Sequence, residues 1–312
     1  MNNFFLSFPI PKSSTQIAFG EKVLFLGSCF SDEMANKARY NGLKCHTNPF
    51  GTIFHPIPLG RFIIETINGN SNERGFQNQS EFYSWDASTV ISGSTELELN
   101  EKLAEIRKEW LFHISTCKVL FITFGTSWGY WKNDIVVANC HKRPSNEFSK
   151  KLSSTQDIVD FYKVVIETLK EYNPELRIIF TVSPVRHVRD GLIENNQSKS
   201  VLIEVIRQLI ELYDVQYFPS YEIVVDELRD YRFFSKDRVH PSQEAIDYVW
   251  ERMMDVFCSE NTKGLMKKID SFRKLEQHRP MNMSEEQMIQ HKRRISESKM
   301  ELLKENTEIL LQ

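Results

Sequence analysis

VLFLGSCFSDEMANKARY, residues 23–40, is the stretch of sequence that decides the fold. Its first four residues, Val23–Leu26, form the uninterrupted apolar run that is typical of a strand covered on both faces. The turn Gly27-Ser28-Cys29-Phe30 follows directly, and residues 32–40 can continue as a helix. A strand, a tight turn and a helix in this order predict the first unit of a parallel sheet.

Three further apolar runs repeat this arrangement, and each ends at a polar or proline-containing turn. Apolar residues at three- and four-residue spacing, typical of amphipathic helices, separate them, as in Ile158–Leu169 and Val201–Leu212. The alternation predicts an α/β fold with a mostly parallel sheet flanked by helices. The three runs are Val119–Phe124, Arg177–Val182 and Val215–Phe218.

The stretch from about residue 63 to 94 is less regular. It contains Asn-Gly and Ser-Gly turn signals, and its apolar residues alternate around Phe82–Trp85 and Thr89–Ile91. Alternation beside turn residues predicts an irregular or hairpin insertion in the sheet.

The composition changes after Cys258. Residues 260–312 carry 11 Lys/Arg and 9 Asp/Glu, and Met288, Ile295, Leu302 and Ile309 recur every seven residues. We therefore expect two parts: a main α/β domain over residues 1–258 and a charged amphipathic helical extension over residues 259–312. One helix should begin at the Ser284–Gln287 capping box. This extension could cover the core, pair with a copy of itself to form a homo-oligomer, or remain free.

Composition excludes several classes of protein. The net charge of −3 argues against a dedicated nucleic-acid binder. The five cysteines form no C-x-x-C pair, which fits a reducing compartment. No apolar run is long enough to span a bilayer, and the N-terminal apolar stretch lacks a basic region before it. We expect no signal peptide, no membrane partner and a cytoplasmic location.

The strongest local signal for chemistry is the Asp237–Ser242 segment, DRVHPS. A carboxylate three residues before a histidine, in a loop ahead of a helix, can orient the imidazole and stabilise its charge. His240 could then act as a general base and Asp237 as its partner. Pro241 is expected at the first turn of the helix that follows. A surface loop with a satisfied histidine is the alternative interpretation.

The turn after the first strand offers a nucleophile. Cys29 or Ser28 would lie at the carboxyl edge of the sheet, where open α/β folds build their sites. A helix N-terminus at this position is expected to lower the pKa of the thiol. The alternative is a turn and helix cap beside a small buried cysteine.

Six motifs follow one another along the chain: Phe25–Phe30 (FLGSCF), Asn48–Ile53 (NPFGTI), Thr123–Trp128 (TFGTSW), Val137–Lys142 (VANCHK), Thr181–His187 (TVSPVRH) and Asp237–His240 (DRVH). In this order they resemble the GSCFA domain family, which is itself similar to the SGNH/GDSL hydrolase superfamily. The resemblance covers about residues 5–257 and leaves out the C-terminal extension. It implies a three-layer, SGNH/flavodoxin-like fold and makes residues 1–258 the expected catalytic domain.

The resemblance implies roles for some of these residues. In register with the Gly-Asp-Ser block of the superfamily, Cys29 falls on the nucleophilic serine, and a shift of one residue would make Ser28 the nucleophile. Gly51 matches the glycine whose backbone N–H enters the oxyanion hole. The asparagine of the third block is missing here, so Ser127 or Asn139 would have to donate in its place. Losing one such donor typically costs about 10²–10³ in turnover.

Two histidines are further candidates for substrate binding. His187, with Arg186 and Arg189 beside it, could bind an anionic or sugar group, and His141, next to Lys142, could line the same cleft. Ordinary loop hydrogen bonding is the alternative for both. We expect no metal, because the spacing of the remaining cysteines and histidines matches no ligand pattern, and no cofactor, because nucleotide-binding motifs are missing. The cysteines and histidines considered are Cys45, His46, His55, Cys140 and His141.

The predicted function is therefore ester hydrolysis through a covalent acyl-enzyme. The expected substrate is a small-molecule or glycan ester, such as an acylated carbohydrate. An acyltransferase would use the same residues with a sugar hydroxyl in place of water. A binding module that kept the fold and lost the reaction, or a helical interaction protein acting through residues 284–312, are the non-enzymatic alternatives.

Overall fold

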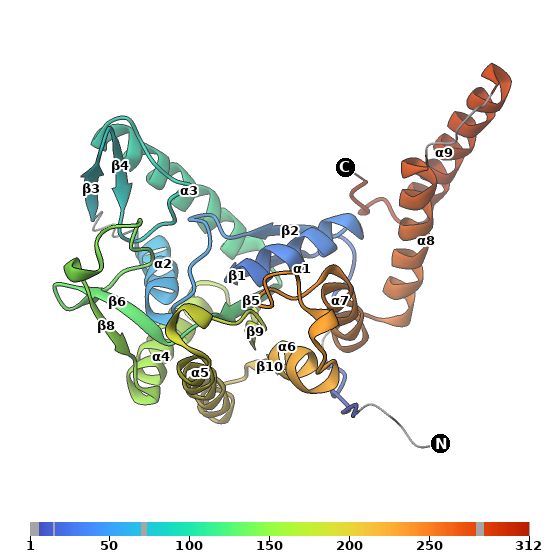
Figure 1. The fold of residues 1–312 in the computed structure, drawn as a ribbon. Coiled ribbons are helices and arrows are strands. Elements are labelled where there is room, and N and C mark those ends of the chain that lie inside the picture. Colours follow the sequence, from blue (N-terminus) through green and yellow to red (C-terminus); the bar gives the residue numbers. More distant parts are fainter. Residues whose placement is uncertain (1–5, 15, 70–73, 279–283, 312) are drawn as a thin grey trace.

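A five-stranded parallel sheet forms the centre of the molecule, in the order β10-β9-β5-β1-β2 (Figure 1). The computed structural model describes residues 6–14, 16–69, 74–278 and 284–311. Counted within this sheet alone, the strand order is 2-1-3-4-5, the doubly wound order of flavodoxin-like folds. The predicted three-layer α/β fold is confirmed. The strands are β1 (Lys22–Gly27), β2 (Lys44–Thr47), β5 (Val119–Phe124), β9 (Arg177–Val182) and β10 (Gln216–Phe218).

Helices cover both faces of the sheet. Alternate residues of a strand point to opposite faces, so each inner strand contributes to two apolar clusters. Val23 and Phe25 pack with α1 (Cys29–Tyr40) and α7 (Gln243–Phe257). Leu24 and Leu26 belong to the second core, on the other face. The helices of that face are α2 (Pro56–Asn68), α3 (Glu96–Thr116), α4 (Thr155–Tyr172) and α5 (Leu192–Leu212).

The turn from β1 into α1 depends on Gly27. This residue pairs with Thr123 of β5 and has a φ of +124°. A Cβ at this position would lie 2.0 Å from the carbonyl oxygen of Thr123, so no other residue fits without moving the strands. Ser28 then caps α1, because its Oγ accepts a hydrogen bond from the N–H of Phe30.

Two small antiparallel elements are attached to the main sheet. The hairpin of β3 (Gly75–Asn78) and β4 (Glu81–Ser84) confirms the expected insertion. The partner of the Phe82 region is not Thr89–Ile91, however, which forms no strand. A second sheet, β7-β6-β8, was not predicted. Its strands are β6 (Trp128–Lys132), β7 (Ile135–Val136) and β8 (Ser149–Leu152).

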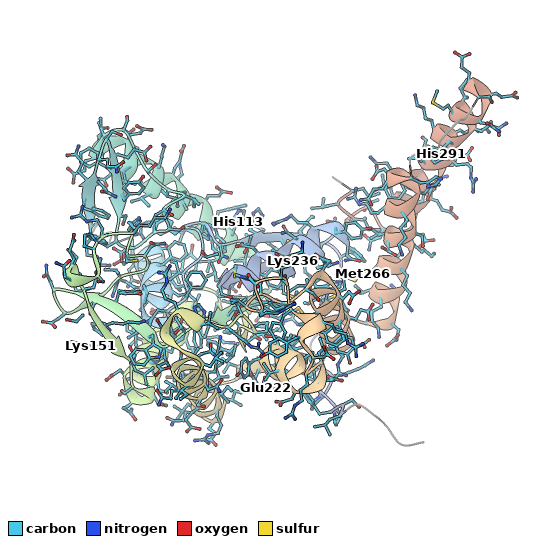
Figure 2. The ribbon with its side chains drawn as sticks, viewed as in Figure 1. His113, Lys151, Glu222, Lys236, Met266 and His291 are labelled. Atoms are coloured by element: carbon cyan, nitrogen blue, oxygen red, sulfur yellow. The ribbon has the colours of Figure 1, made fainter. Side chains whose placement is uncertain are left out.

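The C-terminal extension is a pair of helices, α8 (Glu260–Gln277) and α9 (Glu285–Glu305), which project from the main body (Figure 1). The predicted capping box at Ser284 and Gln287 is present. Figure 2 shows Met266 of α8 near the body and His291 on the projecting α9. The short remaining turns are η1 (Ser145–Glu147), η2 (Val188–Asp190), α6 (Ser220–Glu222), η3 (Ile223–Glu227) and η4 (Tyr231–Phe233).

The extension covers part of the core and does not hang free. Ile269 of α8 is fully buried in the same apolar cluster as α1 and α7, and Leu302 joins them. After α9 the chain returns to the body, where Ile309 is buried and the N–H of Leu310 donates to the carbonyl of Gly42 at 3.0 Å. Of the seven-residue repeat, Ile295, Leu302 and Ile309 pack against the core, whereas Met288 is half exposed.

None of the helices among the described residues has the length and apolar character to cross a bilayer.

Candidate active site

Several of the predicted site residues follow strands of the main sheet and therefore lie at its carboxyl edge. Cys29 comes directly after β1, Ser127 after β5, and His187 after β9. The strand order reverses between β1 and β5, which makes this the switch point where doubly wound folds bind ligands. Cys29 therefore lies at the position that the fold favours for chemistry.

Asp237 and His240 form a close pair. Asp237 Oδ2 lies 2.7 Å from His240 Nδ1, and its Oδ1 accepts hydrogen bonds from the N–H groups of Val239 and His240 at 2.9 and 3.1 Å. These hydrogen bonds, that of the imidazole first, lower the pKa of Asp237 to about 2. About half of each side chain is exposed. The carboxylate stays charged near neutrality and binds Nδ1 of His240, which leaves Nε2 as the ring nitrogen for a reaction partner.

The loop that carries this pair is closed by backbone hydrogen bonds. The N–H of Ser235 donates to the carbonyl of His240 at 2.8 Å, and Arg238 has a φ of +60°. Pro241 pairs with Phe234 in an isolated bridge. The expectation for Pro241 was therefore wrong: it precedes Ser242, the cap of α7, because this bridge holds it outside the helix.

Ser28 and Cys29 differ in accessibility. Ser28 is fully buried, and its Oγ is engaged in capping α1. Cys29 is the first residue of α1 and is partly exposed. Cys29 is thus more accessible than Ser28.

The environment of Cys29 does not lower the pKa of its thiol. Burial raises this pKa, and the carboxylates of Asp32 and, to a smaller extent, Glu33 raise it further. The N–H groups of Cys29 and Phe30 act in the opposite direction but are outweighed. The expectation of a lowered pKa took account of the helix N-terminus and missed the two acidic residues in the first turns of α1.

Asn48, in the NPFGTI motif, holds the turn that carries the nucleophile candidates through side-chain hydrogen bonds. Its Oδ1 accepts a hydrogen bond from the N–H of Gly27 at 2.8 Å. Its Nδ2 donates to the carbonyl of Ser28 and to Oδ1 of Asp32. The motif is part of the family resemblance, but no role was predicted for Asn48 from the sequence. Its φ of +35° lies in the left-handed region, which asparagine adopts more readily than most residues with a side chain.

Two of the predicted oxyanion donors are engaged elsewhere. The N–H of Gly51 donates to the carbonyl of Asn48 at 2.9 Å, which closes a turn. Ser127 is fully buried, with its N–H and hydroxyl directed to Ser198 of α5. Neither group is free to meet a substrate in this conformation.

Asn139 and His141 lie beside the β3–β4 hairpin. His141 is buried, its Nε2 lies 2.8 Å from the carbonyl of Ser84, and its ring packs against Trp85. Oδ1 of Asn139 accepts from the N–H of His141 at 2.7 Å. The Nδ2 amide of Asn139 makes no hydrogen bond within the described part of the chain. His141 is therefore held as a packing residue, whereas Asn139 keeps a donor to offer.

His187 lies in the segment after β9, which contacts the Asp237–His240 loop. The N–H of Arg186 donates to the carbonyl of Val239 at 3.2 Å, so the segment after β9 runs along the Asp237–His240 loop. Burial lowers the pKa of His187 to about 3, with smaller contributions from the charges of Lys199 and His240. His187 is thus a neutral neighbour of His240, with a buried Nε2 that has no partner among the described residues.

Lys199 was missed by sequence reasoning. It lies on the inner face of α5, is 1% exposed, and its Nζ donates to the carbonyls of Gly125 and Ser183, each at 2.7 Å. Burial lowers its pKa to about 7, and Cys29 acts in the opposite direction. The signal in the sequence is a lysine three residues before Leu202, in phase with the apolar stripe of the helix.

One group of residues among those described has the composition of a metal site: His46, Glu109 and His113. The two imidazoles are stacked with centroids 3.5 Å apart, and Nζ of Lys22 lies 3.2 Å from Nδ1 of His113. Stacked rings do not direct their nitrogens at a common point, and an ammonium beside them repels a cation. These residues therefore do not fit a metal ion.

Comparison with protein families matches residues 22–253, more than half of the chain, to the GSCFA family. Comparison with curated proteins finds no match.

Several solved structures are similar to the chain. An acetyl xylan esterase from the rumen bacterium Butyrivibrio proteoclasticus is 12% identical, with a TM-score of 0.41 over 77% of this chain, which spans 64% of that protein. A GDSL-like lipase from Parabacteroides merdae is 14% identical, with a TM-score of 0.41 over 79% of this chain and 98% of the lipase. The periplasmic domain of a lipopolysaccharide acetyltransferase from Salmonella Paratyphi A is 10% identical, with a TM-score of 0.38 over 77% and 84% of the two chains.

Proposed function

The chain belongs to the GSCFA family, and on that premise we propose that it cleaves esters through a covalent acyl-enzyme. The observation that carries the proposal is the Asp237–His240 pair, with its 2.7 Å contact and exposed imidazole, on the same sheet edge as Cys29. A base oriented by a carboxylate and an accessible nucleophile are the parts that acyl transfer needs.

In the proposed reaction, Nε2 of His240 takes the thiol proton while the sulfur of Cys29 attacks the ester carbonyl. The tetrahedral intermediate collapses to a thioester and expels the alcohol, which receives the proton from His240. Water, activated by the same imidazole, then releases the acid and restores the thiol. A base is required because the raised pKa keeps the Cys29 thiol protonated at neutral pH.

We assign the nucleophile to Cys29 and not to Ser28, because the hydroxyl of Ser28 is buried and occupied as a helix cap. The oxyanion would be met by the N–H of Cys29 at the start of α1 and by the Nδ2 amide of Asn139. Gly51 and Ser127 are less suited to this role, since their donors are engaged within the fold.

The substrate class that we propose is an acylated carbohydrate. About half of the surface of the His240 side chain is exposed, so an ester carried on a large polar molecule can reach the imidazole. A sugar hydroxyl could reach it as well, and it would then accept the acyl group in place of water.

The test compares initial rates on p-nitrophenyl acetate for the wild type and for Cys29→Ala, Ser28→Ala, His240→Ala and His291→Ala. We expect a loss of about 10³-fold or more for Cys29→Ala and His240→Ala. His291→Ala, on the projecting α9, is the matched histidine control and should be unchanged. Ser28→Ala should keep its activity and lose about 1 kcal/mol of stability with its cap.

Two results would contradict parts of the proposal, and a third measurement separates hydrolysis from acyl transfer. A wild type without turnover and without an acyl adduct in the mass spectrum excludes the acyl-enzyme. Loss of activity in Ser28→Ala with retention in Cys29→Ala moves the nucleophile to Ser28. Product analysis with xylose added as an acceptor distinguishes transfer from hydrolysis, because only transfer yields an acylated sugar.

A further inference from the structure

Lys199 carries a buried amine that the proposed reaction does not yet use. Its side chain crosses from α5 to the carboxyl ends of β5 and β9, where Nζ donates to the carbonyls of Gly125 and Ser183. Both acceptors are neutral, so these two hydrogen bonds position the amine without compensating a positive charge. A buried ammonium without a carboxylate partner is costly and calls for another source of negative charge.

The sheet brings this amine to the nucleophile. β5 lies between β9 and β1, and adjacent strands are about 4.8 Å apart. Gly125 follows β5 directly, and Gly27, two residues before Cys29, pairs with Thr123 of the same strand. Ionisation of Cys29 would raise the pKa of Lys199, against the larger effect of burial.

The other ionisable groups around Lys199 come from two further elements. His187, in the segment after β9, is held neutral because burial lowers its pKa to about 3. Tyr221 of α6, whose ring centre lies 5.7 Å from Nζ, stays neutral because burial raises its pKa. On the far side of Cys29, Asp32 and Glu33 of α1 oppose a thiolate. Among these groups, only Lys199 supplies a positive charge from within the fold.

We propose that Lys199 is a positioning residue whose ammonium provides the counter-charge of the Cys29 thiolate. It would stabilise the nucleophile from the buried side of the carboxyl edge of the sheet. This inference rests on the proposed role of Cys29. When the S–H bond breaks, His240 takes the proton, the electron pair stays on sulfur, and the ammonium of Lys199 remains beside it unchanged. In a poorly polarisable surrounding such a pair is worth far more than in water, which offsets the effect of Asp32.

The first experiment measures how fast iodoacetamide alkylates Cys29 between pH 5.5 and 10, by mass spectrometry of the peptide that contains it. In Lys199→Met the rate should fall at least about tenfold at pH 6–7, which is one pKa unit of the thiol. The difference should shrink as the pH rises to 10, because the amine of the wild type is then neutral. Lys163→Met, which removes an exposed lysine of α4, should behave as the wild type.

A purely structural role for Lys199 predicts a different profile. It would change the rate by the same factor at every pH, or leave it unchanged, and either result would overturn the inference. Cys140, partly exposed in another part of the molecule, serves as the internal reference in the same digest.

A second experiment does not depend on the folding of the lysine variant. Cys29→Asp places a permanent carboxylate where the thiolate would form, and the titration of Lys199 is followed by NMR of the full chain with isotopically labelled lysine. The pKa of Lys199 should rise by at least about one unit, and an unchanged titration would refute the pairing. Neither experiment uses an ester, so a protein that fails to cleave esters but shows the coupling loses the proposed function and keeps this inference.

Discussion

Ile269→Ala tests whether the C-terminal extension stabilises the rest of the chain. Ile269 is 0% exposed, and its Cδ1 would lie 3.1 Å from a Cβ placed on Gly42. It packs in one apolar cluster with α1 and α7. Ile289 of α9 is the matched control, since the same side chain is 67% exposed there.

The expected magnitude follows from the atoms removed. Replacing isoleucine with alanine removes three carbons, each worth about 0.8 kcal/mol when buried, and leaves a cavity at a site enclosed by α1. The loss in the free energy of unfolding should therefore be about 2–5 kcal/mol for Ile269→Ala. For Ile289→Ala it should be within about 0.5 kcal/mol, because an exposed side chain gains little from its neighbours.

Urea unfolding at 25 °C, followed by circular dichroism and by the fluorescence of Trp250 and the other tryptophans, measures both variants. With a slope of about 3 kcal/mol per M, the midpoint for Ile269→Ala should fall by about 1 M. If its midpoint moves no further than that of Ile289→Ala, α8 does not stabilise the body through this contact. A transition in which only the helical signal changes would show that residues 259–312 unfold separately, as the predicted division at residue 258 implies.

Three further predictions concern the sheet edge. Gly27→Ala should lower the melting temperature by several degrees or prevent folding, because its Cβ would meet the carbonyl of Thr123 at 2.0 Å; Gly264→Ala, in open space on α8, should be neutral or slightly stabilising in the same thermal scan. Burial lowers the pKa of Lys199 to about 7, so between pH 7 and the usual value near 10.5 the unfolded chain binds more protons than the folded one. The free energy of unfolding of the wild type should therefore rise with pH over this interval relative to Lys199→Met, and equal slopes in urea titrations at pH 7 and 9.5 would contradict this. Asn48→Ala removes the acceptor for the N–H of Gly27 and should reduce ester cleavage with little change in the circular dichroism spectrum; an unchanged rate would show that the turn holds without it.

The main sheet could be predicted because its central strands are covered on both faces. Val119–Phe124 is entirely buried, and such strands appear in a sequence as continuous apolar runs. β2 could not be found in this way, since the edge strand Lys44–Thr47 is short and largely polar. The β6–β8 sheet was missed for a similar reason, because Ser149–Leu152 is mostly exposed and carries two lysines.

In the candidate site, contacts between residues close in the sequence could be predicted, and contacts between distant residues could not. Asp237 and His240 could be paired from the sequence, because three residues of loop place their side chains within reach of each other. Lys199 could not be placed, since its acceptors lie 74 and 16 residues away and only the folded sheet brings them together. The occupied donors of Ser127 were equally hidden, because α5 supplies their partner.

In the closed loop around His240, the orientation of the imidazole and the position of the loop over the sheet depend on different contacts. A base proposed for catalysis needs both. The direction of the imidazole is set inside the loop, by Asp237 and by the bond from the N–H of Ser235, and needs nothing from the rest of the chain. The location of the loop over the sheet depends on distant contacts such as that between Arg186 and Val239. A change in the segment after β9 would therefore displace the proposed base from the proposed nucleophile while the Asp237–His240 pair itself remains intact.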